Sequence, residues 1–177
     1  MTGSPATKSK LEMSIEIGAS ADHLWNILGN GFGEVAEITT VLNASHLEGP
    51  LGTGGTRVCI NPQNQRIAEQ LTTFDPDTHT LAYDGIDGFP SWVRTAGNHW
   101  QIKETGPNSA RFTIKPTLTV AWWISPVLPL MLMGVRPILR KFMNEVKYFA
   151  EHGTPHPKVV QRRAKLAAKA TAQAQRS

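Results

Sequence analysis

Residues 122–148 read WWISPVLPLMLMGVRPILRKFMNEVKY, a long stretch that is apolar at its start and amphipathic towards its end. It follows a series of short segments in which apolar and polar residues alternate, the pattern of half-buried β-strands. A chain that builds most of a sheet first and one long helix last buries both most simply by curling the sheet around the helix. Such an arrangement often leaves a cavity, which favours binding of a hydrophobic small molecule.

The helical periodicity of this stretch is strongest in its second half. Apolar residues recur there at helical spacing, while basic and polar residues occupy the opposite face. The recurring residues are Val135, Ile138, Leu139, Phe142, Val146 and Phe149. Pro126, Pro129 and Pro137 predict a break or kink in the front part, and the segment 152–155 predicts the end of the helix.

The chain before this helix predicts an antiparallel sheet. Leu11, Met13, Ile15 and Ile17 alternate with polar residues, which indicates a half-buried strand. Two short helical segments should follow, since Ser20 is a good N-cap and the glycines near residue 30 stop a helix. Six further strand signals lie at 38–47, 56–61, 65–74, 80–84, 92–104 and 110–120. Their connections are too short for helical crossovers, so the strands should pair antiparallel.

The charge of the chain divides it into three parts. The net charge is +4, but six of the 18 basic residues follow Glu151, which leaves 12 basic against 14 acidic residues elsewhere. Residues 1–10 are small, polar and basic, so we expect a disordered tail there. Residues 158–177 are expected to be a basic, alanine-rich tail, and one domain lies between the two tails. The last segment is interpreted as a disordered, solubilising extension, or as a helix that forms on an anionic membrane or nucleic acid.

Several other classes of function find little support in the sequence. Cys59 is the only cysteine, so no internal disulfide is expected, and the start of the chain lacks the apolar core of a signal peptide. We expect cytoplasmic residence, no metal, no cofactor and no nucleic-acid partner, and the oligomeric state stays open. His152 and His156 are four residues apart, but Gly153 and Pro155 between them disfavour a helical zinc site.

The order of these elements resembles the helix-grip fold of the START/Bet v 1-like (SRPBCC) superfamily. The stretches that carry the resemblance are IEIGASADHLWNIL, GTGGTRVCI, AEQLTTFDPDTHTLAYDG and RKFMNEVKYFAEHGTPHP. The last is similar to the closing helix of bacterial polyketide cyclase or dehydrase members. The resemblance covers residues 11–157 and implies that they form one ligand-binding domain. It also implies an α+β fold in which a curved antiparallel sheet wraps a long C-terminal helix, with two short helices after the first strand.

The resemblance also implies a deep apolar cavity between sheet and helix, and three functional hypotheses follow. The leading one is binding or transport of a lipid, sterol or polyketide-like molecule in that cavity. The alternative is a cofactor-independent cyclase or dehydratase that uses the same cavity. The third is a membrane-associating module that makes peripheral contact through Trp122–Val135 and the basic tail.

Polar residues on apolar strand faces are the candidate site residues. Glu69 shares a face with Ile67 and Leu71, and it matches by resemblance an acidic pocket position of abscisic-acid receptors. It is interpreted as a ligand anchor or an acid/base, or else as a rim residue paired with Arg57 or Arg66. Tyr83 shares a face with Leu81, so its hydroxyl either anchors a ligand or reaches the surface from an ordinary core position.

The strand segment around His99 supplies further candidates. Trp100 and Ile102 are predicted to point inward, which places Asn98 inward and His99 outward unless a bulge at Gly97 swaps them. His99 is the second candidate acid/base beside Glu69.

The closing helix and the residues before it complete the list of candidates. On the closing helix, Met131, Leu139 and Phe142 complete the predicted ligand-binding set, although Met131 fits generic helix core equally well. Trp122 and Trp123 fit a cavity lid, an interfacial anchor or the core of the strand–helix junction.

Overall fold

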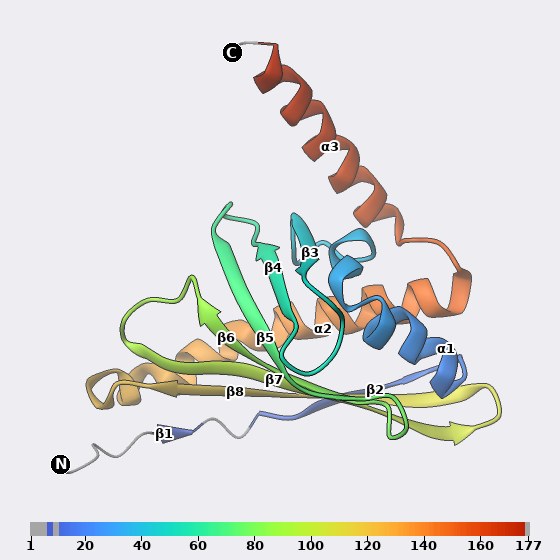
Figure 1. Ribbon diagram of the computed structural model, residues 1–177, viewed down its shortest axis with the longest axis horizontal. Coiled ribbons are helices and arrows are strands. Elements are labelled where there is room, and N and C mark those ends of the chain that lie inside the picture. The colour runs from blue at the N-terminus through green and yellow to red at the C-terminus, as the bar shows by residue number, and fades with distance from the viewer. Residues whose placement is uncertain (1–6, 9–10, 176–177) are drawn as a thin grey trace.

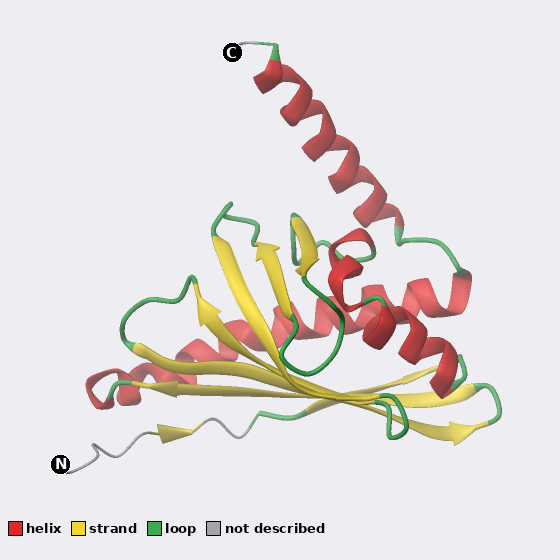
Figure 2. Ribbon diagram, in the orientation of Figure 1, coloured by secondary structure: helices red, strands yellow, loops and turns green. Residues whose placement is uncertain are grey.

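The computed structural model describes residues 7–8 and 11–175, and it contains a curved antiparallel sheet with one long helix laid across it (Figures 1 and 2). The strands are β1 (Thr7–Lys8), β2 (Met13–Ile17), β3 (Ala44–Glu48), β4 (Thr56–Ile60), β5 (Arg66–Asp75), β6 (Thr80–Asp87), β7 (Val93–Gly106) and β8 (Ser109–Val120). The helical elements are α1 (Ala21–Trp25), η1 (Asn26–Asn30), η2 (Phe32–Glu37), η3 (Trp122–Val127), α2 (Leu128–His152) and α3 (Pro157–Ala174).

The sheet has the order β1-β8-β7-β6-β5-β4-β3, and β2 also pairs with β8. Every pairing is antiparallel. From β3 to β8 the strands follow one another through turns and loops, which are too short for helical crossovers. The predicted fold class is confirmed: this is an α+β helix-grip fold, with short helices after the strand β2 and a long C-terminal helix across the sheet.

The short helices begin where the sequence predicts. The Ser20 hydroxyl accepts a hydrogen bond from the His23 N–H at 3.2 Å and so caps α1. The chain then continues as one π-helical turn, η1, and a 3-10 helix, η2. Leu24, Leu28 and Phe32 from these segments are buried against the sheet.

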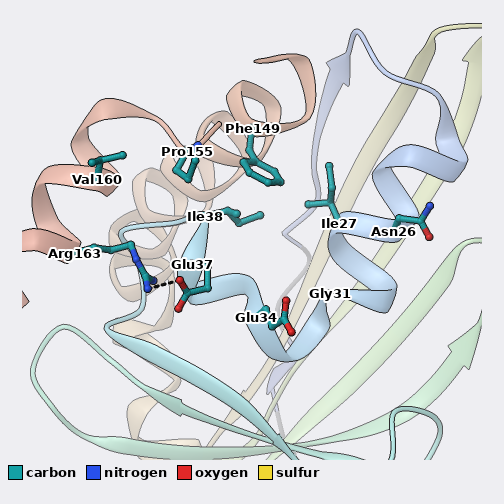
Figure 3. Close-up of a pocket in the computed structure, with 10 residues that line it drawn as sticks. All are labelled: Asn26, Ile27, Gly31, Glu34, Glu37, Ile38, Phe149, Pro155, Val160 and Arg163. Atoms are coloured by element: carbon teal, nitrogen blue, oxygen red, sulfur yellow. Dashed lines mark ion pairs between the residues drawn. The ribbon is translucent and has the colours of Figure 1, made fainter. Parts of the chain in front are cut away.

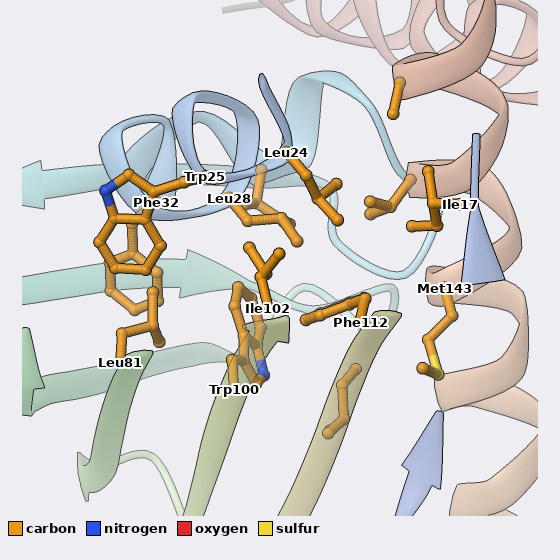
Figure 4. Packing of buried hydrophobic residues seen from close by; sticks show 14 of the residues in the cluster. Ile17, Leu24, Trp25, Leu28, Phe32, Leu81, Trp100, Ile102, Phe112 and Met143 are labelled. Carbon is orange, nitrogen blue, oxygen red and sulfur yellow. The ribbon is translucent and has the colours of Figure 1, made fainter. Parts of the chain in front are cut away.

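Aromatic side chains form the centre of the core (Figure 4). Trp100 on β7 lies with its ring centroid 5.8 Å from Phe112 on β8 and 5.4 Å from Phe142 on α2. Phe112 and Phe142 in turn are 6.3 Å apart. These tilted and edge-on contacts join sheet to helix, and they add specific pair energy to the burial of large apolar rings.

The helix α2 is packed in its second half and exposed in its first. Phe142, Met143, Val146 and Ala150 are buried, whereas most residues before Leu139 are not. Pro126 lies in η3 and Pro137 lies inside α2, so the predicted disturbance of the front part takes the form of a 3-10 segment followed by a helix. Gly153 ends the helix at φ 70°, a left-handed C-cap that glycine adopts at little cost.

Two predicted boundaries need correction. The strand expected over 38–47 is limited to Ala44–Glu48, because the chain before it turns away and bonds to α2 through Thr40. The segment after residue 157, expected to be a disordered extension, forms the helix α3. Alanine-rich composition favours that helix, the His156 side chain caps it, and Arg162 bonds to Asn43.

The disorder expected for residues 1–10 falls almost wholly outside the described residues. Only Thr7 and Lys8 are described, and they pair with the end of β8.

Candidate functional site

A buried ion pair between neighbouring strands forms the polar centre of the candidate site. Arg57 on β4 and Glu69 on β5 are register partners. The Arg57 Nε and Nη2 atoms donate to the Glu69 Oε2 atom at 2.9 and 2.5 Å. The Arg57 side chain is only 3% exposed and that of Glu69 15% exposed. Burying such a pair costs desolvation free energy that its mutual attraction only partly offsets, so stability alone does not explain it.

The remaining faces of the Arg57 guanidinium are also occupied. Its Nη1 atom donates to the Phe32 carbonyl oxygen at 3.1 Å. The group lies 3.8 Å from the centre of the Phe32 ring and 5.0 Å from that of Tyr83, which are cation–π distances. Burial alone lowers the pKa of Arg57, but the Glu69 carboxylate more than reverses this, so the guanidinium remains charged.

The ion pair lies at the wall of a cavity of about 110 Å³ between the sheet and α2. Tyr83, Asn98, Trp100 and Ile114 line it from β6, β7 and β8. The residues that close it from the helical side and from the segment before β3 are Val35, Val41, Leu42, Ile138, Leu139 and Phe142. An apolar chamber with a few convergent polar groups is the usual composition of a small-molecule site.

Two polar atoms near the cavity lack a partner. The Asn98 Oδ1 atom and the Trp100 Nε1 atom are buried, and neither forms a hydrogen bond within the described part of the chain. Leaving a buried donor or acceptor unpaired costs about 1–3 kcal/mol. Burial also raises the pKa of Tyr83, with the Glu69 carboxylate adding to the effect, so its hydroxyl is protonated at neutral pH. The Tyr83 hydroxyl is hydrogen-bonded with the Asn98 side chain, so one acceptor, Asn98 Oδ1, and one donor, Trp100 Nε1, are available to a bound molecule.

Cys59 lies beside the ion pair without being reactive. Its Sγ atom is 3.5 Å from the Glu69 Oε2 atom. Burial raises the pKa of the thiol to about 12, so almost no thiolate is present at neutral pH. A thiol in this state is a poor nucleophile, which excludes it as the centre of covalent catalysis.

The sequence-predicted residues fall into two groups. Glu69, Tyr83, Asn98, Trp100, Leu139 and Phe142 all line the cavity. Met131 does not, because it lies more than one turn before Leu139 in the exposed half of α2. Arg57 was considered only as a rim partner for Glu69, although it is the most deeply buried charge of the site. Its signal was a lone arginine inside the short strand TRVCI.

His99 is excluded from the cavity by strand alternation. It pairs with Ala82 and Lys115, whereas its neighbours Asn98 and Trp100 line the cavity. Partial burial lowers the pKa of His99, and the Lys115 charge lowers it further. Its role as the acid/base of a cavity reaction finds no support in this placement.

His99 should make stability sensitive to acid. Because its pKa is lower in the folded than in the unfolded chain, the unfolded state binds the proton first as the pH falls. The contribution of His99 to the free energy of unfolding is complete above pH 6.5, the ordinary pKa of histidine. It is lost as the pH falls towards the lower pKa that His99 has in the folded chain. The free energy of unfolding, measured in urea, should therefore fall less between about pH 7.5 and about pH 5.5 for His99→Gln than for the unaltered chain. Equal losses would contradict this.

A pair of hydrogen bonds closes one side of the cavity. The Glu145 carboxylate on α2 is buried and accepts from the Thr40 N–H at 2.8 Å and from the Thr40 hydroxyl at 2.6 Å. The next two residues, Val41 and Leu42, line the cavity. Glu145 thus holds the segment before β3 against the helix.

A second and larger hollow lies on the surface (Figure 3). It measures about 520 Å³ and lies between η1, η2, the end of α2 and the start of α3. Ile27, Ile38, Phe149 and Val160 line it, and an Arg163–Glu37 ion pair lies at its edge. None of its lining residues carries a buried polar atom without a partner, in contrast to the inner cavity. We therefore assign the candidate site to the inner cavity.

The curved sheet, the closing helix and the cavity between them define a helix-grip protein of the START/Bet v 1-like superfamily. The model of the family described as polyketide cyclase/dehydrase and lipid transport matches residues 8–150. The chain therefore belongs to that family. Membership supports hydrophobic ligand binding or cyclase activity in general terms. No curated protein matches the chain.

Solved structures with the same fold differ widely in what they do. A norcoclaurine synthase from Thalictrum flavum, in complex with a transition-state analogue, has a TM-score of 0.69 at 15% identity, covering 86% of this chain and 100% of that one. The Zhui aromatase/cyclase from Streptomyces sp. R1128 has a TM-score of 0.68 at 14% identity, with coverages of 82% and 94%.

An uncharacterised protein from Bacillus thuringiensis has a TM-score of 0.64 at 22% identity, with coverages of 79% and 97%. At these identities, the three likenesses show the fold alone.

Proposed function

We propose that this protein binds or carries an amphipathic small molecule whose apolar part lies under α2 and whose polar end is an uncharged hydroxyl or carbonyl group. The observation that carries the proposal is the pair of buried, unpartnered polar atoms, Asn98 Oδ1 and Trp100 Nε1, in an otherwise apolar chamber. A hydroxyl can accept from one and donate to the other. We expect the protein to be cytoplasmic.

The charge balance of the site favours a neutral head group. Arg57 is already paired with Glu69 and bonded to the Phe32 carbonyl oxygen, so among the described residues that line the cavity no unpaired cation is present to bind a carboxylate. A ligand carboxylate would be buried beside Glu69 without compensation, which is costly in an apolar chamber. Sterols and polyketides carry hydroxyl and carbonyl groups of the required kind, whereas fatty acids do not.

The size of the cavity indicates how the remainder of the ligand is accommodated. About 110 Å³ is less than the 300–1,000 Å³ typical of ligand sites, so it holds a head group and a short apolar segment. Ile138 both lines the cavity and is 54% exposed, which places an opening beside the first half of α2. The loosely packed first half of the helix and the segment held by Glu145 can move apart to admit a longer chain.

Calorimetric titration with decan-1-ol and with decanoate tests the proposal. We expect the alcohol to bind about tenfold or more tightly than the carboxylate, because only the alcohol avoids an unpaired buried charge. Asn98→Leu should weaken decan-1-ol binding by about tenfold, the value of one hydrogen bond. Asn108→Leu in the exposed β7–β8 turn is the matched control and should bind as the unaltered chain does.

Tighter binding of decanoate would contradict the neutral head group. No binding of either compound, with both variants folded, would contradict the carrier role.

A cyclase or dehydratase is the second candidate, and one observation favours it. The Glu69 carboxylate and the protonated Tyr83 hydroxyl face the same chamber, which supplies a proton acceptor and a proton donor. Under this hypothesis Glu69→Gln should abolish turnover while binding is retained, whereas for a carrier it should change affinity only.

A further inference from the structure

The first half of the long helix carries an apolar surface that the fold leaves uncovered. Its members are between 47% and 69% exposed and come from η3 and the first half of α2. We call this set the front surface, and it consists of Trp122, Trp123, Val127, Leu130, Met133 and Ile138. Contiguous exposed apolar residues of this size usually mark an interaction site.

Basic residues without partners border the front surface. Arg136, Arg140 and Lys141 are exposed, and none of them forms an ion pair within residues 11–175. The sequence has no acidic residue at all from Thr105 to Asn144. The helix α2 therefore combines an apolar first part with cationic side chains after it. Arg136 and Arg140 also line a hollow beside β2 that contains Glu12, but the Glu12 carboxylate pairs with Lys115. This charge pattern is complementary to an anionic surface.

We propose that the front surface docks the protein on an anionic lipid bilayer, with α2 lying in the plane of the interface. Tryptophan rings prefer the headgroup level of a bilayer, and an amphipathic helix with aromatic and aliphatic residues beside basic ones binds such interfaces. The proposal goes beyond ligand binding and does not depend on it. If the protein both binds a ligand in the cavity and docks through the front surface, the cavity opening at Ile138 faces the bilayer.

Spanning the bilayer is a different arrangement, and the packing of the helix opposes it. The stretch Trp122–His152 contains an 18-residue window with a mean hydropathy of 1.3, so by length and composition it could cross a membrane. Its second half, however, holds Phe142, Met143 and Val146 in the core. Inserting the helix across a bilayer would remove these side chains from the sheet. A helix that lies on the surface keeps them in place.

The basic helix α3 is not part of this surface. It leaves from the C-terminal end of α2, at the opposite end from η3 (Figure 1). The 25 residues of α2 span about 37 Å. The sequence predicts one membrane contact through Trp122–Val135 together with the basic C-terminal segment, whereas in the structure these two parts lie at opposite ends of α2. A second copy of the chain is also disfavoured as the occupant, because the two cationic borders would repel each other.

Vesicle co-sedimentation of the full chain tests the proposal. Vesicles of equal parts phosphatidylcholine and phosphatidylglycerol should bind the protein, and binding should weaken with added salt. Replacing Arg136, Arg140 and Lys141 together by Gln should lower this binding by about 100-fold. Trp122→Ala with Trp123→Ala should lower it by about tenfold or more, and both rings are exposed, so the fold should survive.

The control is Lys165→Gln with Lys169→Gln in α3, which should bind as the unaltered chain does. The proposal is overturned if the unaltered chain ignores these vesicles, or if the α3 control loses as much binding as the tryptophan variant. It is also overturned if light scattering shows a dimer that the tryptophan variant dissociates. If calorimetry still detects decan-1-ol binding in any of these cases, the proposed ligand binding in the cavity is not contradicted.

Discussion

Arg57→Met is expected to destabilise the protein by about 3 kcal/mol, because it leaves the Glu69 carboxylate facing an apolar chamber without its partner. The Glu69 side chain retains 15% exposure, which limits the loss to the lower end of the range for broken buried pairs. In a chain of this size, that corresponds to a fall in Tm of about 6–12 °C. Differential scanning calorimetry at neutral pH measures it.

The double variant Arg57→Met, Glu69→Leu is the control for that result. It removes both charges, and apolar replacement of a whole buried pair is often neutral or stabilising. Most of the lost stability should therefore return, while affinity for decan-1-ol should not return fully if the pair orients the ligand. A double variant as unstable as the single one would show that the arginine acts through packing against Phe32 and Tyr83.

Phe112→Ala should be at least as damaging, with a loss of about 3–5 kcal/mol and a fall in Tm of about 6–20 °C. Phe112 has no exposed surface and contacts both Trp100 and Phe142, so its removal opens a cavity where β7, β8 and α2 meet. Ile86→Ala, at a residue that is 56% exposed, is the matched apolar control and should change stability little. Similar losses at both positions would contradict the assignment of the core.

The fold could be predicted because its signals are local. Alternation from Leu11 to Ile17, the Ser20 cap and the β7–β8 hairpin all depend on residues near one another in sequence. The disordered extension expected for 158–177 is wrong, because the helix α3 depends on contacts between residues far apart in sequence. Its anchoring contacts are long-range, from Arg162 to Asn43 and from Arg163 to Glu37, and a low-complexity basic sequence does not reveal them.

The candidate site was predictable only in part. Strand alternation placed Asn98 and Trp100 on the inner face and His99 on the other, and the structure has this arrangement. The sequence predicts Arg57 only as a rim partner of Glu69, because an arginine is normally a surface residue and its burial depends on a cross-strand carboxylate twelve positions away. Met131 lies outside the cavity, because helical periodicity predicts a face of the helix and not how far along the helix the sheet extends.

The crystal structure of the protein soaked with decan-1-ol tests the central claim most directly. The account predicts the hydroxyl within hydrogen-bond distance of Asn98 Oδ1 or Trp100 Nε1, and the alkyl chain running past Leu139 towards Ile138. Electron density for the alcohol in the surface hollow beside α3, with the inner cavity unchanged, would contradict it.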